Sequence, residues 1–553
     1  MAAPIPQDYS FGNRSAHYIY DDLCRDREGV VEKARELAKI SIPYLFPPEG
    51  YRPGDTLPPP NQSINARCIV NLSSRIMYTA LPPSKPILKY NIIEHKMKGE
   101  LDADPQLYAE TKLALAARER ANRERLEATS IRSAYVQAAS QLILAGNLLW
   151  KQLDINYPSV HRCDTYVVKR NATGQQLFNI LKQVVNLNDL DAATRAFIEN
   201  TREFHADERA KAEFTDEVVV YACCKLHQHS KNRRVWLYWE ETETGEMIPD
   251  TDVMCEFDAP PQYAAWMIPN FGHNWGTSYC QQYEGDMYIV ENTEGALNDG
   301  AEAAALTWIF VKPGGVTSAR VLKRAENLKV MNGDASDITV FRLDKNNDFA
   351  WVAQRSDAAA RRLGAAFLMV SSIQRNAERV TAEEWRMMAS ELDQAMGGLY
   401  SELAQGMGRN IVMRFLALQH EEDPSLKPLP EGLVRVGVIT GIDALGLSDE
   451  EANLENALGV IAKLVGPAAM AQILQATNIA KRVFAGNSVN PSGLVKEDDQ
   501  QKQEMVEAQQ TQLQGDVVRA ATPALAKEGA AAASQVITPQ MMQALQQQQQ
   551  QQM

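Results

Sequence analysis

The chain has 553 residues, of which 45% are hydrophobic, and its 56 basic and 70 acidic side chains give a formal net charge of −14. At about 150 residues per domain, this length predicts roughly three or four units with enough apolar material for a buried core. The acidic balance argues against a protein that grips nucleic acid over its whole surface, because such proteins carry excess positive charge.

The cysteines and the N-terminal sequence indicate the cellular compartment of the protein. The cysteines are few, odd in number and scattered, which indicates a reducing compartment and free thiols rather than a disulfide framework. The first residues lack the basic and apolar regions of a signal peptide, and no run of about 18 apolar residues occurs. We therefore expect neither secretion nor membrane insertion. The cysteines are Cys24, Cys68, Cys163, Cys223, Cys224, Cys255 and Cys280.

The first part of the chain predicts helices separated by proline-rich loops. Residues 1–25 are polar and proline-bearing, which is typical of an arm. Apolar residues at helical spacing predict helices over 32–45, 65–80, 105–127 and 129–153. The third of these helices is rich in alanine and arginine, with acids and bases at helical spacing. This pattern favours a solvated face with weak ion pairs over a basic face toward DNA.

The next stretch changes from helical to alternating periodicity. A pair of helices is expected over 177–204, with Asp191 as the cap of the second helix. Apolar residues then alternate with others over 218–226 and again over 235–239, which predicts two strands. Residues 230–234 supply the turn, so the pattern indicates a hairpin.

A cluster of cysteine and histidine residues in this hairpin is a candidate metal site, because both residue types bind zinc. Its members are Cys223, Cys224, His227 and His229. Their spacing differs from that of the known zinc ribbons, and no second ligand pair accompanies them. Lys225 lies on the same face of the strand as Cys223, His227 and His229 and would repel a cation. The cluster therefore favours an ordinary hairpin with a basic tip.

A helix leads into a short strand near the middle of the chain. Helical periodicity over 277–307 is followed by the apolar run 308–312, which Pro313-Gly314-Gly315 ends as a strand. A second helix is predicted over 356–370. The segment between the two helices is therefore an insert that they enclose.

The insert predicts a small mixed domain. Its segment 317–331 is amphipathic, and strands are expected over 337–343 and 349–352 around a polar turn. Four basic side chains of the amphipathic segment form a candidate docking patch for an acidic protein, since complementary charge steers association. These residues are Arg320, Lys323, Arg324 and Lys329.

The longest helical pattern follows the polar loop 371–380. Thr381 and Glu384 form a capping box, which predicts a helix start, and apolar residues recur at helical steps from Trp385 to Met407. Gly397-Gly398 indicates a bend or a close helix crossing, because glycine costs about 1 kcal/mol relative to alanine inside a helix.

The C-terminal part predicts a strand, helices and a tail. The strand is expected over 434–440, and a second capping box, Ser448 with Glu451, starts helices that end by Gly486. The residues after them are rich in alanine, glutamine and charge, a composition that cannot bury enough apolar surface to fold alone. We expect the tail 489–553 to be disordered or loosely helical.

Four segments occur in an order that resembles one protein family. The segment from Glu378 to Gln405, ERVTAEEWRMMASELDQAMGGLYSELAQ, is similar to the long wing helix of portal proteins, the head-to-tail connectors of short-tailed bacteriophages. The other segments are LILAGNLLW from Leu142, NWGTSYCQQYEGDM from Asn274 and VITGIDALG from Val438. Their order and spacing carry the resemblance, which covers approximately residues 60–485. Family members place a proline shortly after the YS segment, where this chain has residues 405–409, QGMGR.

The resemblance implies a mainly helical α+β portal fold that assembles as a ring, typically of twelve subunits. In this fold the two helices that enclose the insert form a stem, and the insert is a clip. The implied parts are an N-terminal arm and wing (1–276), a stem helix (277–307), a clip (308–352), a second stem helix (353–370), a tunnel loop (371–380), the long wing helix (381–432), a crown (433–488) and the C-terminal tail (489–553).

The tunnel loop is the segment that the resemblance places next to DNA. It has no proline or glycine, and its charged groups, repeated around a ring, would form a weakly attractive belt for a duplex. The alternative is an ordinary surface loop between two helices. The candidate DNA-facing residues are Ser371, Ser372, Gln374, Arg375, Asn376, Glu378 and Arg379.

A portal is the ring at one capsid vertex through which a DNA genome is packaged and ejected. The resemblance therefore implies a place in the virion, and in the host cytoplasm during assembly. The implied partners are further copies of the chain, double-stranded DNA, the terminase large subunit, a tail adaptor or gatekeeper, the major capsid and scaffolding proteins and, as a further option, internal core proteins. No membrane partner, cofactor, metal or catalytic residue is predicted.

Two other classes of function compete with the portal interpretation. A packaging ATPase would need a phosphate-binding loop, and the sequence has no G-x-x-x-x-G-K-[ST], H-E-x-x-H or G-x-S-x-G motif. A non-portal helical scaffold or tail adaptor of a phage particle would be nearly all-helical, whereas this chain inserts strands at two places. The portal interpretation leads, and we expect no enzyme activity.

Overall fold

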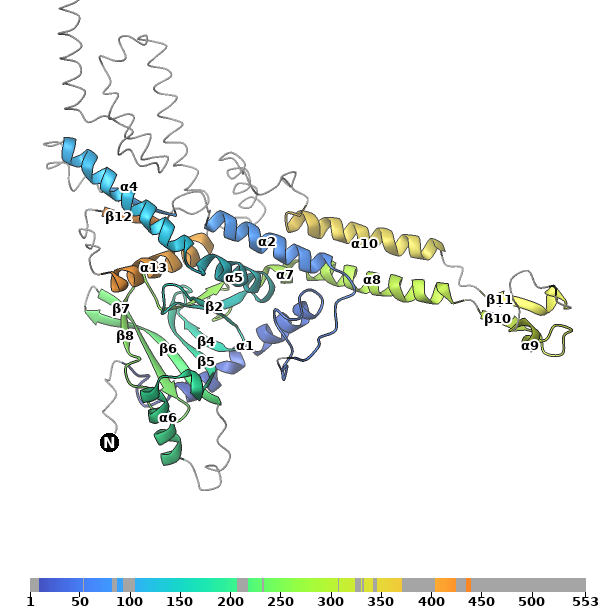
Figure 1. Cartoon of the computed structure of the whole chain (residues 1–553), viewed down its shortest axis with the longest axis horizontal. Helices are drawn as coiled ribbons and strands as arrows, with labels where there is room; N and C mark the ends of the chain where they lie inside the picture. Colours follow the sequence, from blue (N-terminus) through green and yellow to red (C-terminus); the bar gives the residue numbers. More distant parts are fainter. Residues whose placement is uncertain are drawn as a thin grey trace, which may run out of the picture. The chain divides into compact units, whose positions relative to one another are not determined.

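The computed structural model describes residues 9–52, 54–81, 87–92, 105–205, 217–230, 233–306, 308–323, 330, 333–341, 346–369, 403–423 and 434–438 (Figure 1). All of them belong to one of the two units into which the chain divides, Met1–Glu450. The other unit, Glu451–Met553, lies outside the described residues, and so do the predicted helices after Ser448 and the C-terminal tail. The described part mixes helices with antiparallel strands, as the sequence predicts.

Three of the helices that contribute to the largest apolar core come from the first part of the chain, and the first of them starts earlier than predicted. They are α1 (Ala16–Lys39), α2 (Ile64–Ala80) and α5 (Ile131–Ala145). The prediction that a polar arm extends to residue 25 is wrong. A Glu241 carboxylate oxygen accepts a hydrogen bond of 2.8 Å from the Ala16 amide, and an anion at a helix N-terminus is favourable. This contact joins residues far apart in the sequence, so local periodicity does not reveal it.

Gly146 ends α5 and turns the chain into strand β2 (Asn147–Lys151), so the predicted single helix over 129–153 is wrong beyond this point. Gly146 has φ 76°, and a Cβ there would lie 2.5 Å from the backbone nitrogen of Ser278. The Asn147 side chain exchanges two hydrogen bonds of 2.8 Å with the backbone of Gly276. Two of the segments that carry the family resemblance therefore contact each other here.

Two antiparallel sheets complete the sheet domain (described residues 9–276). Their strand orders are β3-β2-β9 and β4-β5-β6-β7-β8. The remaining strands are β3 (Ser159–Arg162), β4 (Tyr166–Arg170), β5 (Gln176–Asn186), β6 (Glu217–Ser230), β7 (Arg233–Thr242), β8 (Val253–Glu256) and β9 (Gln262–Trp266). The predicted hairpin is confirmed as β6 and β7, which pair antiparallel.

Strand β5 replaces the first of the two helices predicted over 177–204. It pairs with β6 from Phe178↔Lys225 to Asn186↔Glu217, and this pairing overrides the local helical pattern. The second predicted helix is confirmed as α6 (Ala192–His205). Its predicted cap is also confirmed, because an Asp191 carboxylate oxygen accepts hydrogen bonds from the two amides at positions 193 and 194, at 3.1 and 3.0 Å.

Helix α4 (Pro105–Glu127) has the predicted bounds and lies against α13 (Arg409–Glu422). Arg125 of α4 forms an ion pair of 2.9 Å with Glu422 of α13. At least one charged side chain of this alanine- and arginine-rich helix is therefore paired within the chain. A further two-stranded sheet pairs β1 (Leu88–Ile92) with β12 (Val434–Val438), which confirms the predicted strand after residue 433.

A π-helical turn, Ala404–Gly408, precedes α13. It overlaps residues 405–409, at which the sequence departs from the pattern of the family that it resembles. Because a π turn interrupts the regular hydrogen bonding of an α-helix, it is a recognised cause of helix kinks. The rest of the predicted long helix, residues 381–402, lies outside the described part.

Candidate functional site

Two long helices lie side by side, and the insert connects them (Figure 1). They are α8 (Glu284–Ala305), preceded by the short α7 (Tyr279–Gln282), and α10 (Asn346–Ala366). The helix predicted over 277–307 is confirmed, with a break at Tyr283. The strand predicted over 349–352 is wrong, because these residues belong to α10. The Phe349 ring packs over Gly300 of α8, and this contact favours an earlier helix start.

Polar contacts link the two helices of this helix hairpin at two levels. The Arg362 guanidinium of α10 donates two hydrogen bonds to the carboxylate of Asp286 of α8, at 3.0 and 2.5 Å. These bonds hold the pKa of Asp286 below its usual value, because they favour the charged form. Further along, the Ser356 hydroxyl donates to Glu294 at 2.6 Å. The hairpin therefore has a fixed register in which its helices run antiparallel.

Aromatic rings hold the base of the hairpin. The rings of Tyr279, Tyr283 and Phe367 have centroids 5.2 to 5.6 Å apart, in tilted or edge-on arrangements. The Tyr279 hydroxyl donates a hydrogen bond of 3.1 Å to the Ala366 carbonyl. Phe367 is fully buried, so the end of α10 is anchored in the main core.

Helix α10 ends four residues before its predicted end at residue 370. The Met369 amide bonds to the Gly364 carbonyl at 2.7 Å and the Leu368 amide to the Ala365 carbonyl at 3.2 Å, which is the Schellman pattern of a helix C-terminus. Leu368 has φ 58°, a left-handed conformation that costs roughly 1–2 kcal/mol for a residue with a Cβ. The packing of Leu368 in the core offsets this strain.

The predicted tunnel loop begins directly after this helix end. Its residues 371–380, including Arg375 and Arg379, lie outside the described part. The assignment of this loop to DNA therefore stays a prediction.

The insert (described residues within 308–341) is held together mainly by polar contacts. Strands β10 (Trp308–Val311) and β11 (Ile338–Phe341) lie within two of the predicted strands, and they pair antiparallel with each other. Thr317 joins the loops below them, because its amide donates to the Asp337 carboxylate at 3.2 Å and its hydroxyl donates to the Asp334 carbonyl at 2.9 Å. The Asp334 carboxylate accepts a bond from the Ser336 amide, which lowers the pKa of Asp334.

The surface of the insert is strongly apolar. Trp308 is 58% exposed and Phe310 is 55% exposed, and the residue between them, Ile309, is exposed as well. Successive strand residues point to opposite faces, so neither face of β10 is covered by the described residues. The other exposed large apolar residues around the insert are Leu306, Val316, Val330, Val340 and Trp351.

The four residues of the predicted docking patch are only partly placed. Arg320 belongs to the short helix α9 (Ala319–Leu322), Lys323 follows it, and both are exposed. Arg324 and Lys329 lie outside the described residues. The exposed apolar residues were not among the predicted site residues. Their signal in the sequence is the run of three large apolar side chains from Trp308 to Phe310 in a very short strand.

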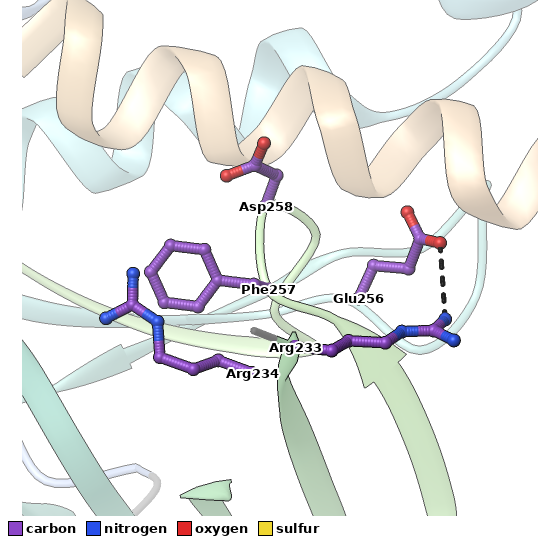
Figure 2. Close-up of a pocket in the computed structure, with 5 residues that line it drawn as sticks. All are labelled: Arg233, Arg234, Glu256, Phe257 and Asp258. Atoms are coloured by element: carbon purple, nitrogen blue, oxygen red, sulfur yellow. Dashed lines mark ion pairs between the residues drawn. The ribbon is translucent and has the colours of Figure 1, made fainter. Parts of the chain in front are cut away.

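A shallow hollow lies beside the tip of the β6–β7 hairpin (Figure 2). The Arg234 guanidinium lies 3.9 Å from the centre of the Phe257 ring, and Arg233 forms a long ion pair of 3.9 Å with Glu256. Asp258, which also lines the hollow, pairs with Arg409 of α13 at 3.1 Å. The hollow is open and its side chains satisfy one another, so it has the character of surface packing rather than of a ligand site.

The cysteine and histidine cluster lies in the same hairpin. Cys223 and Cys224 point to opposite sides of β6, into two different apolar cores, and burial raises the pKa of both thiols. Among the described residues, no group of histidine, cysteine and carboxylate side chains could hold a metal ion. All seven cysteines are free. Within the same residues, no helix combines the length and apolarity needed to cross a membrane.

Comparison with known proteins assigns the class that these features fit. The family model for the bacteriophage head to tail connecting protein matches residues 13–495, so the chain belongs to this family. Its function is that of a portal, the connector between the phage head and tail. The match confirms the family resemblance of the four sequence segments.

Individual relatives extend over most of the chain. The portal protein of Enterobacteria phage T3 is 31% identical over 500 residues, which cover 90% of this chain and 91% of that protein. The portal protein of Escherichia phage T7 is 30% identical over 506 residues and covers the same shares. Among solved structures, the neck of an empty gene transfer agent (GTA) particle, computed with C6 symmetry, matches with a TM-score of 0.35 and 12% identity, over 77% of this chain and 90% of that chain.

Proposed function

We propose that the chain forms a ring of identical subunits at the head–tail junction of a phage particle and that double-stranded DNA passes through the ring. The exposed apolar surface of the insert is the observation that carries this proposal. Several large apolar side chains exposed on one small insert indicate an interaction surface, and an isolated two-stranded sheet is only marginally stable in water. Cyclic symmetry lets every subunit bury the same patch against its neighbours.

In this ring, the helix hairpin is the stem and the insert is the clip. The aromatic base and the Asp286–Arg362 pair make the hairpin a stiff element that transmits contacts between the clip and the sheet domain. Residues 371–380 are the tunnel loop that reaches the DNA. Arg375 and Arg379 act there as weak, exchangeable phosphate contacts, because exposed mobile ion pairs contribute only about 0–1 kcal/mol.

The clip also docks other proteins of the particle. Arg320, Lys323, Arg324 and Lys329 form the patch for the terminase large subunit during packaging and for the tail adaptor afterwards. The major capsid, scaffolding and internal core proteins are the remaining partners, and the chain itself performs no catalysis. Family membership supports these roles, since a connector must contact the head on one side and the tail on the other.

The oligomeric state of the purified protein tests the proposal. Light scattering across a wide concentration range should show particles of many subunits, and end-on negative-stain images should show a ring with a central opening. A monomer that stays stable at high micromolar concentration, in low and moderate salt, would contradict it. In the ring, deletion of Ser372 to Ala377 should leave assembly intact and reduce packaging or retention of DNA.

A further inference from the structure

The two helices of the hairpin differ in charge. Helix α8 carries six carboxylates and no basic residue, whereas α10 carries three arginines and two aspartates. Four of the six carboxylates have partners within the chain, from Lys33 to Glu284, from Arg362 to Asp286, from Asn61 and Gln62 to Glu291, and from Ser356 to Glu294. The remaining two, Asp299 and Glu302, are exposed and have no hydrogen bond or ion pair to any described residue.

Arg355 and Arg361 are the arginines of α10 that have no ion pair to a described carboxylate, and Arg355 lies nearer to the level of Asp299. Arg355 is exposed, and its guanidinium lies 6.0 Å from the centre of the exposed Trp351 ring, one turn earlier in the helix. No carboxylate of the described part lies within ion-pair distance of Arg355. By contrast, Arg362 lies two turns further along α10, and its guanidinium donates two hydrogen bonds to the Asp286 carboxylate.

The register of the hairpin prevents Arg355 and Asp299 from pairing within one chain. Arg355 is next to Ser356, which lies level with Glu294 of α8. Asp299 is five residues beyond Glu294, which offsets it along the helix by about 8 Å and rotates it by about 140° away from α10. The unpaired acid and the unpaired arginine therefore point away from each other.

We propose that Arg355 of one subunit pairs with Asp299 of the neighbouring subunit, with Glu302 adding to the negative side of the contact. The inference rests on the proposed ring, in which hairpins repeat side by side and α10 of each copy meets α8 of the next. Exposed alanines from residue 301 to residue 305 leave room for a close helix approach. The tilt usual between packed helices, together with the length of an arginine side chain, spans the offset along the axis.

Charge reversal and charge exchange test this contact in the full-length protein. Arg355→Asp and Asp299→Arg should each raise the protein concentration needed for half-assembly, by up to about fivefold at low salt, because one exposed pair is lost at every subunit contact. The double exchange should recover most of the loss, and added salt should reduce all of these differences. As a matched control, Asp189→Arg reverses an exposed acid of the sheet domain and should leave assembly unchanged.

A crosslinking trap gives a readout that does not depend on stability. After treatment with a bis-maleimide whose spacer is about as long as the lost arginine side chain, the double variant Arg355→Cys with Asp299→Cys should form a ladder of covalent multimers on a denaturing gel, while each single variant should not. The inference is overturned if the trap yields only monomers, or if the charge exchange restores nothing. It is also overturned if the reversals leave assembly unchanged and alter only the salt dependence of DNA retention, since Asp299 would then face the channel. If the parent protein forms no ring at all, the proposed function itself fails.

Discussion

The sheet domain and the insert bury their aromatic residues in opposite ways. Trp239 of β7 is fully buried, and its indole nitrogen donates a hydrogen bond of 2.7 Å to Glu241. Trp308 of β10 begins a strand with two exposed faces. A single chain therefore completes the core of the sheet domain by itself, whereas the insert leaves its apolar surface for other molecules to cover. Substitutions in the first region should affect folding, and those in the second should affect assembly.

The largest expected effect is that of Trp239→Ala. Removal of a buried tryptophan leaves a cavity and takes the indole donor from one oxygen of Glu241, so the free energy of unfolding should fall by about 3–5 kcal/mol. Urea unfolding at a concentration where the protein is monomeric would measure this loss. Trp308→Ala removes the same atoms from the insert and should change monomer stability by less than about 1 kcal/mol. Equal losses in the two variants would contradict the comparison.

The comparison also shows how far sequence reasoning extends. Local patterns predict α4, the β6–β7 hairpin and the two helices around the insert, because each of these follows a regular periodicity. They fail for the start of α1 and for β5, since Glu241 and β6 lie far away in the sequence. For the candidate site, charge predicts that Arg320 and Lys323 are exposed. The exposure of Trp308 was missed, because a short apolar strand is normally covered within its own chain.

The next effect concerns assembly and compares two exposed phenylalanines. Phe310→Ser in the insert should weaken ring formation by about 1.5–3 kcal/mol per subunit contact, which is the value of one large apolar side chain that becomes buried. Phe271 of the sheet domain is 67% exposed, so Phe271→Ser is the matched control. Sedimentation or light scattering should show a raised assembly concentration for the first variant alone. If both variants assemble like the parent, the apolar surface of the insert is not a subunit interface.

A smaller effect is expected for the basic patch of the insert. Reversal of Arg320, Lys323, Arg324 and Lys329 to glutamate should slow the binding of the terminase large subunit by about tenfold at low salt, because charge acts mainly on the association rate. Rings should still form. Binding kinetics at two salt concentrations would measure the change, with reversal of the exposed Arg361 of α10 as a control outside the patch. Binding that is unchanged at low salt would remove the patch from the docking surface.

The smallest effect concerns the ion pair within the helix hairpin. It tests whether the hairpin, like the sheet domain, is stabilised by contacts within its own chain. Asp286→Asn removes the ion pair with Arg362, and the loss of unfolding free energy should be small, because solvent screens an exposed pair. Since the pair lowers the pKa of Asp286 in the folded state, its stabilisation is fully present above the unfolded-state pKa of about 3.9. It is lost as the pH falls through the lowered folded-state pKa.

The stability difference between the parent and Asp286→Asn should therefore be constant near neutral pH and disappear in strong acid. Asp357→Asn, a substitution of an exposed acid of α10 without an ion pair to the described residues, should show no such pH dependence. A difference that persists unchanged into strong acid would mean that Asp286 stabilises the hairpin by packing rather than by its charge.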